Sequence, residues 1–344
     1  MKCILFCENA YAFGILAPIK IVLEQRDCNL IWYVSEKIKT EFPYEEELNT
    51  SSMNELITFK ADAIFVPGNE VPHFLRGVKT QIFHGLAGEK KGHFRIRNYF
   101  DLYLTQGPYF TKQFLELSAK SKNFEVVETG WSKLDVYATK QNQYKEYKKE
   151  LLITHKTKNI LLYAPTFSPS LSSATILMNS IQELGQNREN LVLIKFHDLM
   201  EKELCEAYKR LAENHTNIIF VDDRNILKYL IISDLMISDT SSVVYEFLLL
   251  NKPVITLNSR SPKPAWENIL SSSELTDCVK KNLDSDPFSS KRAAIIAEYH
   301  PYKDGESSLR MVEAVENYIL RNGVPEKRKL SFFRKYKINK MYKQ

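Results

Sequence analysis

The stretch DLMISDTSSVVYEFLLLNKPVITL, residues 234–257, decides the fold prediction. It opens with an apolar run at 235–237 that is typical of a buried strand, and the polar cluster 238–242 follows directly. An apolar helical segment at 243–250 comes next, and residues 254–257 have the pattern of a second strand. A strand, a polar turn, a helix and a strand in this order predict one βαβ unit of a parallel sheet.

The polar cluster lies where such a unit binds anions. The first amides of a helix have no partner within the helix, and the helix dipole is positive at that end. Ser238, Thr240, Ser241 and Ser242 add hydroxyls at this position. These residues either cap the helix only, which they do well, or also bind a phosphate. Asp239, an anion, is expected to turn to the helix cap or to neighbouring donors rather than to the phosphate.

Length and composition indicate an ordinary soluble protein of about two domains. The 344 residues are 44% hydrophobic and 26% charged. The five cysteines are scattered without a CxxC pair, which argues against a disulfide framework or a zinc site and fits a reducing compartment. We find no signal peptide and no apolar run long enough to span a membrane, and therefore expect a cytoplasmic location.

Strands and helices alternate along most of the chain, so we expect an α/β protein with two Rossmann-like, doubly wound domains facing a cleft. The expected domains are an N-terminal one at 1–140 and a C-terminal one at 159–322, joined by a charged connection at 141–158 and followed by a basic tail at 323–344. The expected strands are 2–7, 30–34, 63–66, 81–83, 101–105, 125–128, 159–163, 191–196, 217–221, 235–237 and 254–257. The sequence contains neither a GxGxxG turn nor a GxxxxGK[ST] loop, which counts against a nicotinamide enzyme and a P-loop NTPase.

Two histidines directly follow predicted strands, one in each domain. Side chains at the carboxyl ends of parallel strands form the binding sites of such sheets. His84, which precedes Gly85, has an ordinary pKa near neutrality and suits a general base. His197 suits a hydrogen bond to a phosphate or assistance to a leaving group. A structural hydrogen bond alone is the alternative for each histidine.

Two further residues are weaker candidates for anion binding. Arg310 falls in the first turn of a helix that begins at the pair Ser307 and Ser308. Its guanidinium has a bidentate geometry that fits phosphate, although a solvated helix arginine is an equal alternative. His93 lies in a basic loop and either contacts anions or has no role.

Five segments in this order resemble the motifs of the CDP-glycerol glycerophosphotransferase family of bacterial teichoic acid and capsule polymerases and primases. Each motif is weak alone, but together they cover most of the chain from about residue 81 to 315. The segments are Phe83-His84-Gly85 with its Lys/Gly-rich continuation to His93, Ala164-Pro165-Thr166-Phe167, Lys195-Phe196-His197, the cluster 238–243, and DGESSLR at 304–310.

The resemblance implies a GT-B fold with an acceptor-side N-terminal domain and a donor-side C-terminal domain. It implies that an acceptor hydroxyl attacks the β-phosphorus of a CDP-alcohol, so that phosphoglycerol or a related phosphopolyol is transferred and CMP is released. It also implies a donor substrate such as CDP-glycerol, with no separate cofactor and no metal.

The resemblance carries roles to individual residues. His84 matches the proposed base and His197 the donor-side histidine, while Ser241 and Ser242 match the diphosphate-binding hydroxyls. The remaining expected substrate-binding residues are Gly85, Thr166, Ser238, Thr240, Glu246, Ser308 and Arg310. The chain departs from the family pattern at Asp198, where the family usually has Pro, and at Glu246, where it often has Asp. The first departure affects the loop shape, and the second affects ribose or base preference.

The positive charge of the chain belongs to its C-terminal end. Residues 321–344 contain nine Lys or Arg and one Glu, a local charge of +8, so the rest of the chain carries −3. Such a stretch with interleaved aromatics either lies on an anionic membrane surface, binds nucleic acid, or is simply solvated. We expect a nucleotide-activated donor, a glycan or lipid-linked acceptor and no nucleic acid, with the protein peripheral on the inner face of the membrane.

Two alternative functions belong to other classes. The first is another GT-B enzyme, either a sugar-nucleotide glycosyltransferase or a nucleotide-sugar epimerase. The second is a non-catalytic binding protein that acts through its basic tail.

Overall fold

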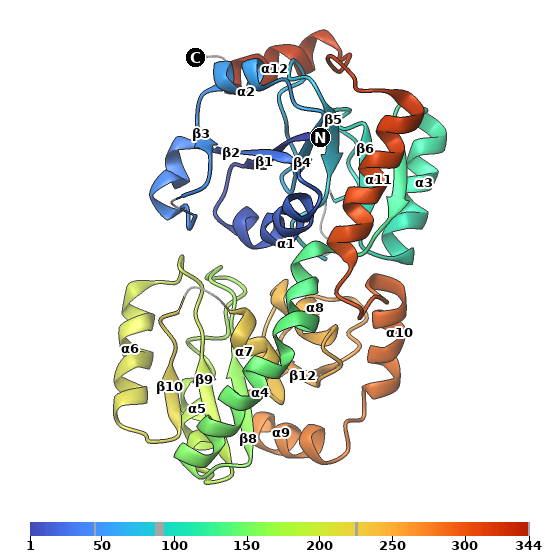
Figure 1. Ribbon diagram of the computed structural model, residues 1–344. Coiled ribbons are helices and arrows are strands. Elements are labelled where there is room, and N and C mark those ends of the chain that lie inside the picture. Colours follow the sequence, from blue (N-terminus) through green and yellow to red (C-terminus); the bar gives the residue numbers. More distant parts are fainter. Residues whose placement is uncertain (45, 87–92, 224–225, 343–344) are drawn as a thin grey trace. The chain divides into compact units, whose positions relative to one another are not determined.

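A computed structural model describes residues 1–44, 46–86, 93–223 and 226–342 of the chain (Figure 1). The Lys/Gly-rich continuation at 87–92 and the last two residues of the basic tail lie outside the described residues. The chain divides into two compact units. Unit 1 comprises Met1–Thr139 and Glu298–Gln344, and unit 2 comprises Lys140–Ala297.

Unit 1 is built on a seven-stranded sheet in which all neighbouring strands run parallel. The order β3-β2-β1-β4-β5-β6-β7 starts from a central β1 and extends in both directions, which is the predicted doubly wound arrangement. The strands are β1 (Lys2–Cys7), β2 (Asn29–Val34), β3 (Asn49–Thr50), β4 (Ala63–Val66), β5 (Val78–Gln81), β6 (Leu102–Thr105) and β7 (Glu125–Glu128). The strand expected at 81–83 is thus wrong in position, because β5 ends at Gln81.

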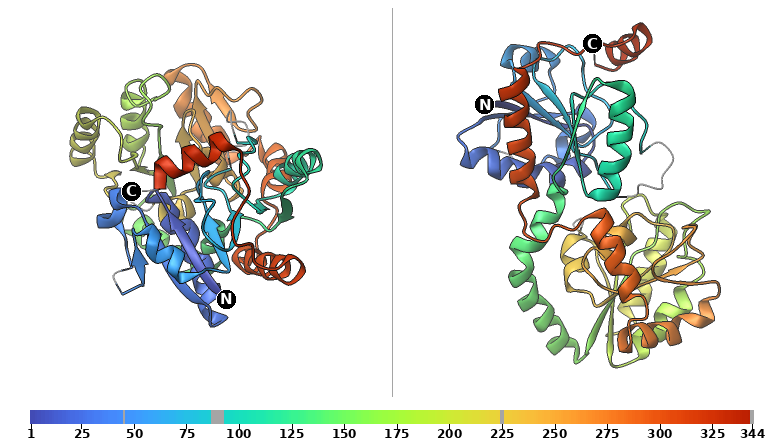
Figure 2. Two further views of the ribbon diagram at one scale, coloured as in Figure 1. Left: turned by 90° about the horizontal axis from the view of Figure 1, so that it is seen from above. Right: turned by 90° about the vertical axis from the view of Figure 1, so that its right-hand side faces the viewer.

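Helices cover both faces of this sheet (Figure 2). Ile4 and Phe6 of β1 share a hydrophobic cluster with residues of α2, α3 and α12. On the opposite face α1 and α11 pack against each other and against the strands. The helices of unit 1 are α1 (Tyr11–Gln25), η1 (Glu36–Glu41), α2 (Met53–Phe59), α3 (Pro108–Ser121), η2 (Ser132–Leu134), α11 (Ser307–Asn322) and α12 (Phe332–Tyr342).

The C-terminal segment corrects the expected domain boundary. The sequence predicts that 159–322 form one C-terminal domain, but α11 belongs to unit 1. Met311, Val312 and Val315 of α11 are buried, and Arg26 of α1 forms ion pairs with Glu313 and Glu316. The helix was predicted from the pair Ser307 and Ser308 at its start, which does not reveal which sheet the helix covers.

The basic tail is not merely a solvated extension. Ile338 and Tyr342 of α12 are buried in the core of unit 1, and the Tyr342 hydroxyl donates a 2.6 Å hydrogen bond to Glu8. Before the helix, Arg328 forms an ion pair with Asp101 and donates to two backbone carbonyls. The apolar residues interleaved with the lysines therefore anchor the tail to its own unit.

Unit 2 has a six-stranded parallel sheet of order β10-β9-β8-β11-β12-β13. The strands are β8 (Asn159–Tyr163), β9 (Asn190–Ile194), β10 (Ile218–Phe220), β11 (Leu235–Ser238), β12 (Val254–Leu257) and β13 (Glu267–Ile269). The five strands predicted for this part are confirmed. The short β13 was missed, because its three residues carry no apolar run.

The helices of unit 2 alternate with these strands. They are α5 (Met178–Gln186), α6 (Lys202–Glu213), α7 (Leu227–Ile232), α8 (Val243–Leu248), η3 (Ser272–Glu274) and α9 (Leu275–Asp284). Two helices, α4 (Asp135–His155) and α10 (Ser289–Tyr299), carry the chain from one unit to the other. The charged connection expected at 141–158 forms most of α4, and Lys148 pairs there with Asp234 of unit 2.

Candidate functional site

Four loops of unit 2 follow neighbouring parallel strands and therefore lie along one edge of its sheet. Strand β8 pairs with β9 on one side and with β11 on the other, and β11 pairs with β12. The loops after these strands carry the Thr166, His197, Ser241 and Arg260 side chains. The carboxyl-end edge of this sheet thus unites three of the motifs predicted from the sequence.

Asp239 connects two of these loops from a buried position. It is 1% exposed, and its carboxylate accepts hydrogen bonds from the Thr166 amide at 2.8 Å and from the Ser173 amide and hydroxyl at 2.8 and 2.9 Å. Burial raises the pKa of Asp239, while these three donors act in the opposite direction. The prediction that Asp239 turns to neighbouring donors is confirmed.

Ser238 and Thr240 hold the same strand end in place. The buried Ser238 hydroxyl donates a 2.6 Å hydrogen bond to the Ala164 carbonyl. The Thr240 hydroxyl oxygen accepts a 3.1 Å hydrogen bond from the Arg260 amide in the loop after β12. Both residues were expected to contact substrate, and both connect strand ends of the sheet.

Two serines, Ser241 and Ser242, directly precede α8. Ser242 precedes the first residue of α8, is exposed, and makes no side-chain cap bond to the helix. Ser241 is half-buried, and its amide donates to the Asp239 carbonyl at 3.0 Å. Ser242 therefore does not cap α8 through its side chain. Anion binding at this end of the helix remains a prediction.

His197 presents one ring nitrogen outward. The Leu199 amide donates a 3.1 Å hydrogen bond to Nδ1, so the proton of the neutral ring is on Nε2. The ring is tilted against Phe167 with centroids 4.5 Å apart, which connects the β8 and β9 loops. Partial burial lowers the pKa of His197, so the ring is neutral at pH 7 and acts as a hydrogen-bond donor through Nε2.

Two other charged residues, Glu246 and Arg260, lie at this edge. Glu246, one turn into α8, is half-buried. Arg260 is exposed, and its backbone is fixed to Thr240. The sequence argument did not select Arg260, although it follows a predicted strand as His197 does. Binding residues of parallel sheets lie at the carboxyl ends of strands, and this rule identifies Arg260 as a cation near the start of α8.

His84 of unit 1 follows β5 by three residues. Its Nδ1 lies 3.1 Å from the Pro67 carbonyl, which only accepts, so Nδ1 carries the proton and Nε2 is the unprotonated nitrogen. The ring is exposed and lies 5.3 Å from the Tyr11 ring. The preceding Phe83 has a φ of 60°, a conformation that costs a bulky residue energy and is concentrated at functional sites. Gly85 accepts a 3.0 Å hydrogen bond from the Gln106 side chain at its carbonyl.

His93 does not fit an anion-binding role. Its ring stacks on Phe83 with centroids 5.4 Å apart and also contacts Phe110. Burial lowers the pKa of His93 to about 4, so the ring is uncharged at neutral pH.

Ser308 and Arg310 lie in unit 1 with His84 and not in unit 2 with His197. The expected convergence of the α11 start with the donor-side residues therefore remains a prediction that involves both units. The Asp135 carboxylate accepts hydrogen bonds from the Ser307 and Ser308 amides at 2.9 and 2.7 Å, so a carboxylate already occupies the helix start. Arg310 binds Asp304 through both terminal nitrogens and donates to the Thr129 carbonyl at 2.8 Å. Both residues fix α11 to unit 1.

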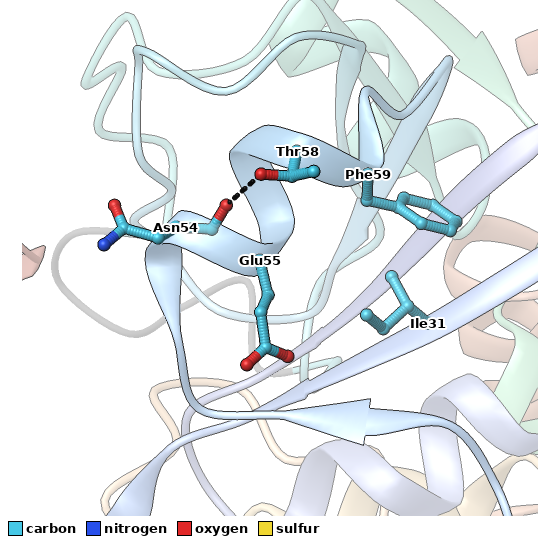
Figure 3. A pocket seen from close by; sticks show the side chains of 5 residues that line it. All are labelled: Ile31, Asn54, Glu55, Thr58 and Phe59. Atoms are coloured by element: carbon cyan, nitrogen blue, oxygen red, sulfur yellow. Dashed lines mark hydrogen bonds between the residues drawn. The ribbon is translucent and has the colours of Figure 1, made fainter.

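The described residues of unit 1 line at least two cavities. One, of about 420 Å³, has charged walls and includes Tyr11, the neighbour of His84. The other, of about 380 Å³, lies beside α2 and is lined by Ile31, Asn54, Glu55, Thr58 and Phe59 (Figure 3). The Thr58 hydroxyl there donates to the Asn54 carbonyl at 2.9 Å, and no expected site residue lines this second cavity.

Metal ligands do not cluster in the part of the chain that the structure describes. No group of three or more His, Cys, Asp or Glu side chains there is arranged to hold a metal ion. The absence of a metal from the reaction remains a prediction from the family resemblance.

The sequence matches proteins that build wall polymers. Over 274 residues the chain is 28% identical to the teichoic acid ribitol-phosphate polymerase TarL of Staphylococcus aureus, a match that covers 71% of this chain and 46% of TarL. Over 231 residues it is 26% identical to the teichoic acid glycerol-phosphate primase of Bacillus subtilis, covering 63% of this chain and 58% of the primase. The chain spans about half the length of the curated relatives it matches.

Solved structures share the fold. The wall teichoic acid polymerase TagF in a structure with CDPG has a TM-score of 0.65 at 18% identity, covering 93% of this chain and 88% of the TagF chain. The S. aureus MnaA-UDP co-structure has a TM-score of 0.66 at 17% identity, covering 93% and 97%. These likenesses confirm the predicted GT-B class, and they do not separate a polymerase from MnaA.

The family profile does separate the polymerases from MnaA. The profile of the CDP-glycerol:poly(glycerophosphate) glycerophosphotransferases matches residues 24–259, which include His84, His197 and the α8 start. The match covers more than half of the chain and agrees with the resemblance predicted from the five motifs. The chain therefore belongs to the CDP-glycerol:poly(glycerophosphate) glycerophosphotransferase family.

Proposed function

We propose that the protein transfers phosphoglycerol, or a related phosphopolyol, from a CDP-activated donor to a hydroxyl of a glycan or lipid-linked acceptor. CMP is the second product, and the reaction serves teichoic acid or capsule polysaccharide synthesis. The observation that carries the proposal is the tautomer of His84, an exposed residue whose Nδ1–H donates to the Pro67 carbonyl, which makes Nε2 the basic nitrogen of the ring. Membership of the glycerophosphotransferase family supports it.

In the proposed reaction, His84 removes the proton of the acceptor hydroxyl as its oxygen attacks the β-phosphorus of the donor. The bond from that phosphorus to the bridging oxygen breaks, and the CMP phosphate leaves with the bonding electrons. Such a transfer depends on an oriented nucleophile and on neutralised phosphate oxygens. The His197 Nε2–H, the Ser241 and Ser242 hydroxyls and the α8 amides supply hydrogen bonds to these oxygens.

The donor side of the proposal includes further residues. Arg260 adds a cation beside Thr240, and Glu246 and Thr166 stand near the donor ribose or base. We leave Ser308 and Arg310 out of the donor site, because their partners lie within unit 1. No separate cofactor is proposed, since the CDP-polyol itself carries the group that is transferred.

Nucleotide preference tests this function directly. Purified protein is melted in the presence of CDP-glycerol, CDP-ribitol, CMP-sugars and UDP-sugars, because a nucleotide that binds the folded state raises the melting temperature. We expect CDP-glycerol or CDP-ribitol to give the largest shift, and CMP to be released when an acceptor is added. A shift with UDP-GlcNAc alone, followed by isomerisation without an acceptor, would instead identify an epimerase.

We further propose that the protein works at the inner face of the cell membrane. No helix in the described residues is both long and apolar enough to cross a bilayer. Surface binding has support on α12, where Phe332, Phe333 and Tyr336 are 78%, 84% and 64% exposed among lysines. Residues 323–344 are therefore the proposed contact.

Vesicle flotation tests this contact with a matched control. The double substitution Phe332→Ser and Phe333→Ser should reduce binding to vesicles of anionic phospholipid. Leu320→Ser removes an 85% exposed apolar side chain from α11 of the same unit and should leave binding unchanged. Equal binding by all three proteins would contradict membrane association through the tail.

A further inference from the structure

The charged cavity of unit 1 combines basic side chains from two distant parts of the chain. It measures about 420 Å³. Arg95 and Arg97 line it from the loop before β6, whereas Arg334 and Lys337 line it from α12. Two carboxylates stand among the described lining residues, so the cations outnumber the acids there. The basic tail thus forms one wall of a cationic cavity in the N-terminal sheet unit.

Three of the four cations have no acidic partner among the described residues. Lys337 forms an ion pair with Glu70, and Glu8 accepts the hydrogen bond of Tyr342. Burial raises the pKa of Glu8, which disfavours the charged form of this second carboxyl group. No described carboxylate lies within ion-pair distance of the three cavity arginines.

The arginines have other contacts that leave their charge available. One terminal nitrogen of Arg97 lies 3.4 Å from the Arg95 carbonyl, and the Arg334 guanidinium lies 5.5 Å from the centre of the Tyr99 ring. Arg95 is exposed, and Arg97 and Arg334 are half-buried. A guanidinium without a carboxylate partner suits a phosphate, because its planar donors match two phosphate oxygens at once.

Exposed apolar side chains lie beside the cavity cations on α12. Residues four positions apart are neighbours on the surface of a helix. Phe333 and Met341 therefore flank Lys337, and they are 84% and 46% exposed. Aromatic side chains at a membrane surface lie at the level of the lipid headgroups. Contact of Phe333 with a bilayer therefore places headgroups next to the cations of the cavity.

We propose that this cavity binds the phosphate group of an anionic membrane phospholipid while the aromatic side chains of α12 enter the headgroup layer. Arg97 and Arg334 donate to the phosphodiester from two different elements, and Arg95 adds a third cation. The inference rests on the proposed membrane contact of residues 323–344 and deepens it. It adds a defined lipid group, and it adds two arginines that lie outside the tail.

A bound headgroup differs from a diffuse attraction in what it requires of the cations. Diffuse attraction of a basic tail to an anionic surface depends on the charge alone. A phosphate held in the cavity also depends on the forked geometry of arginine, which lysine lacks. A substitution that keeps the charge and removes the fork therefore separates these two modes of binding.

Vesicle flotation of a charge-conserving variant tests the proposal. The double substitution Arg95→Lys and Arg97→Lys is compared with the wild-type chain on vesicles of phosphatidylcholine that contain phosphatidylglycerol. The lipid concentration for half-maximal binding should rise about tenfold, because bidentate contacts to phosphate are lost. Arg321→Lys is a matched control, since it makes the same change at an exposed residue of unit 1 outside the cavity lining. It should shift this concentration less than about twofold.

Soluble ligands separate a lipid headgroup from free phosphate. Inorganic phosphate and glycerophosphoglycerol, the deacylated form of phosphatidylglycerol, are titrated calorimetrically into the wild-type protein. Both should bind much more weakly than the vesicles, because neither offers an apolar layer to the aromatic side chains of α12. A soluble ligand that binds as tightly as the vesicles would assign the cavity to that ligand and overturn the proposal.

The remaining outcomes separate this inference from the proposals on which it rests. If the arginine variant floats as the wild type does, while Phe332→Ser with Phe333→Ser does not float, the membrane contact stands and the headgroup site is wrong. If the wild-type protein does not bind the anionic vesicles, the contact and the site are both wrong. Release of CMP from CDP-glycerol is measured separately, so the transferase function can stand or fail independently of the lipid site.

Discussion

At the scale of the residue, the role of His84 depends on which ring nitrogen carries the proton. Its position after a strand was predictable, because strand ends of parallel sheets are recognisable from apolar runs. Its tautomer was not, because Pro67 follows a different strand and only the folded chain brings its carbonyl to Nδ1. The sequence therefore suggests a base, and the fold decides that Nε2 is the basic atom.

Replacement of His84 tests this assignment. His84→Ala should lower kcat for acceptor-dependent CMP release by roughly 10²- to 10⁴-fold, the usual contribution of a general base. The thermal shift with CDP-glycerol should persist, because the proposed donor residues lie in unit 2. His155→Ala, which removes a histidine on α4, serves as the control. Normal turnover by His84→Ala would exclude it as the base.

Asp239 supports the donor loops through three hydrogen bonds. In Asp239→Asn, one carboxylate oxygen becomes an NH₂ group that faces an amide donor of Thr166 or Ser173. We expect a loss of about 2 kcal/mol in the free energy of unfolding of unit 2, together with weaker donor binding. Urea denaturation and the thermal-shift screen measure the two effects. Asp284→Asn, at an exposed site on α9, should be neutral, and equal stability of both variants would show that Asp239 is not a support.

At the scale of the element, the sequence locates a strand well where a short apolar run ends at a polar turn. Strands β11 and β12 were predicted within one residue, because uninterrupted apolar runs end at polar turns. The existence of helix α11 was also predicted, but the unit to which it belongs was not. Its start binds Asp135, a residue more than 170 positions earlier in the chain, and no local pattern encodes that contact.

The tail helix α12 also has contacts that its sequence does not predict, because one face of this basic helix is buried. Ile338 is fully buried, whereas Tyr336 on the same helix is 64% exposed. Ile338→Ala should reduce the free energy of unfolding of unit 1 by about 2–4 kcal/mol through the cavity that it leaves. Tyr336→Ala should change it by less than about 0.5 kcal/mol. Chemical denaturation of both variants checks the contrast, and equal stabilities would mean that α12 is not part of the unit.

At the scale of the whole molecule, the two units are expected to unfold separately and to respond differently to acid. In unit 1 the half-buried His93 and the buried His300 are uncharged at neutral pH, because burial lowers the pKa of each to about 4. The buried His300 accepts a 3.0 Å hydrogen bond from the Trp131 amide at Nε2, so protonation there would break a contact inside the unit. Among the histidines with a resolved pKa shift, unit 2 contributes only the exposed His197.

The pH dependence of unit 1 follows from these two pKa values. In the unfolded chain each histidine binds a proton below its ordinary pKa of about 6.5, whereas in the folded unit it stays neutral down to about pH 4. The unfolded state therefore binds more protons between these limits, and the stability of unit 1 should fall as the pH is lowered from 6.5 to 4. The expected loss is roughly 3 kcal/mol for each histidine over that range.

Tryptophan fluorescence can follow unit 1 alone. Trp32 and Trp131 are buried in unit 1, and Trp266 belongs to unit 2, so Trp266→Phe removes the signal of unit 2. In this background, His300→Gln retains a side-chain acceptor for the Trp131 amide but no longer titrates, and its stability should vary less steeply with pH. Other ionisable groups cancel in the comparison of the two proteins. Identical slopes between pH 6.5 and 4 would show that His300 does not contribute to the acid sensitivity of unit 1.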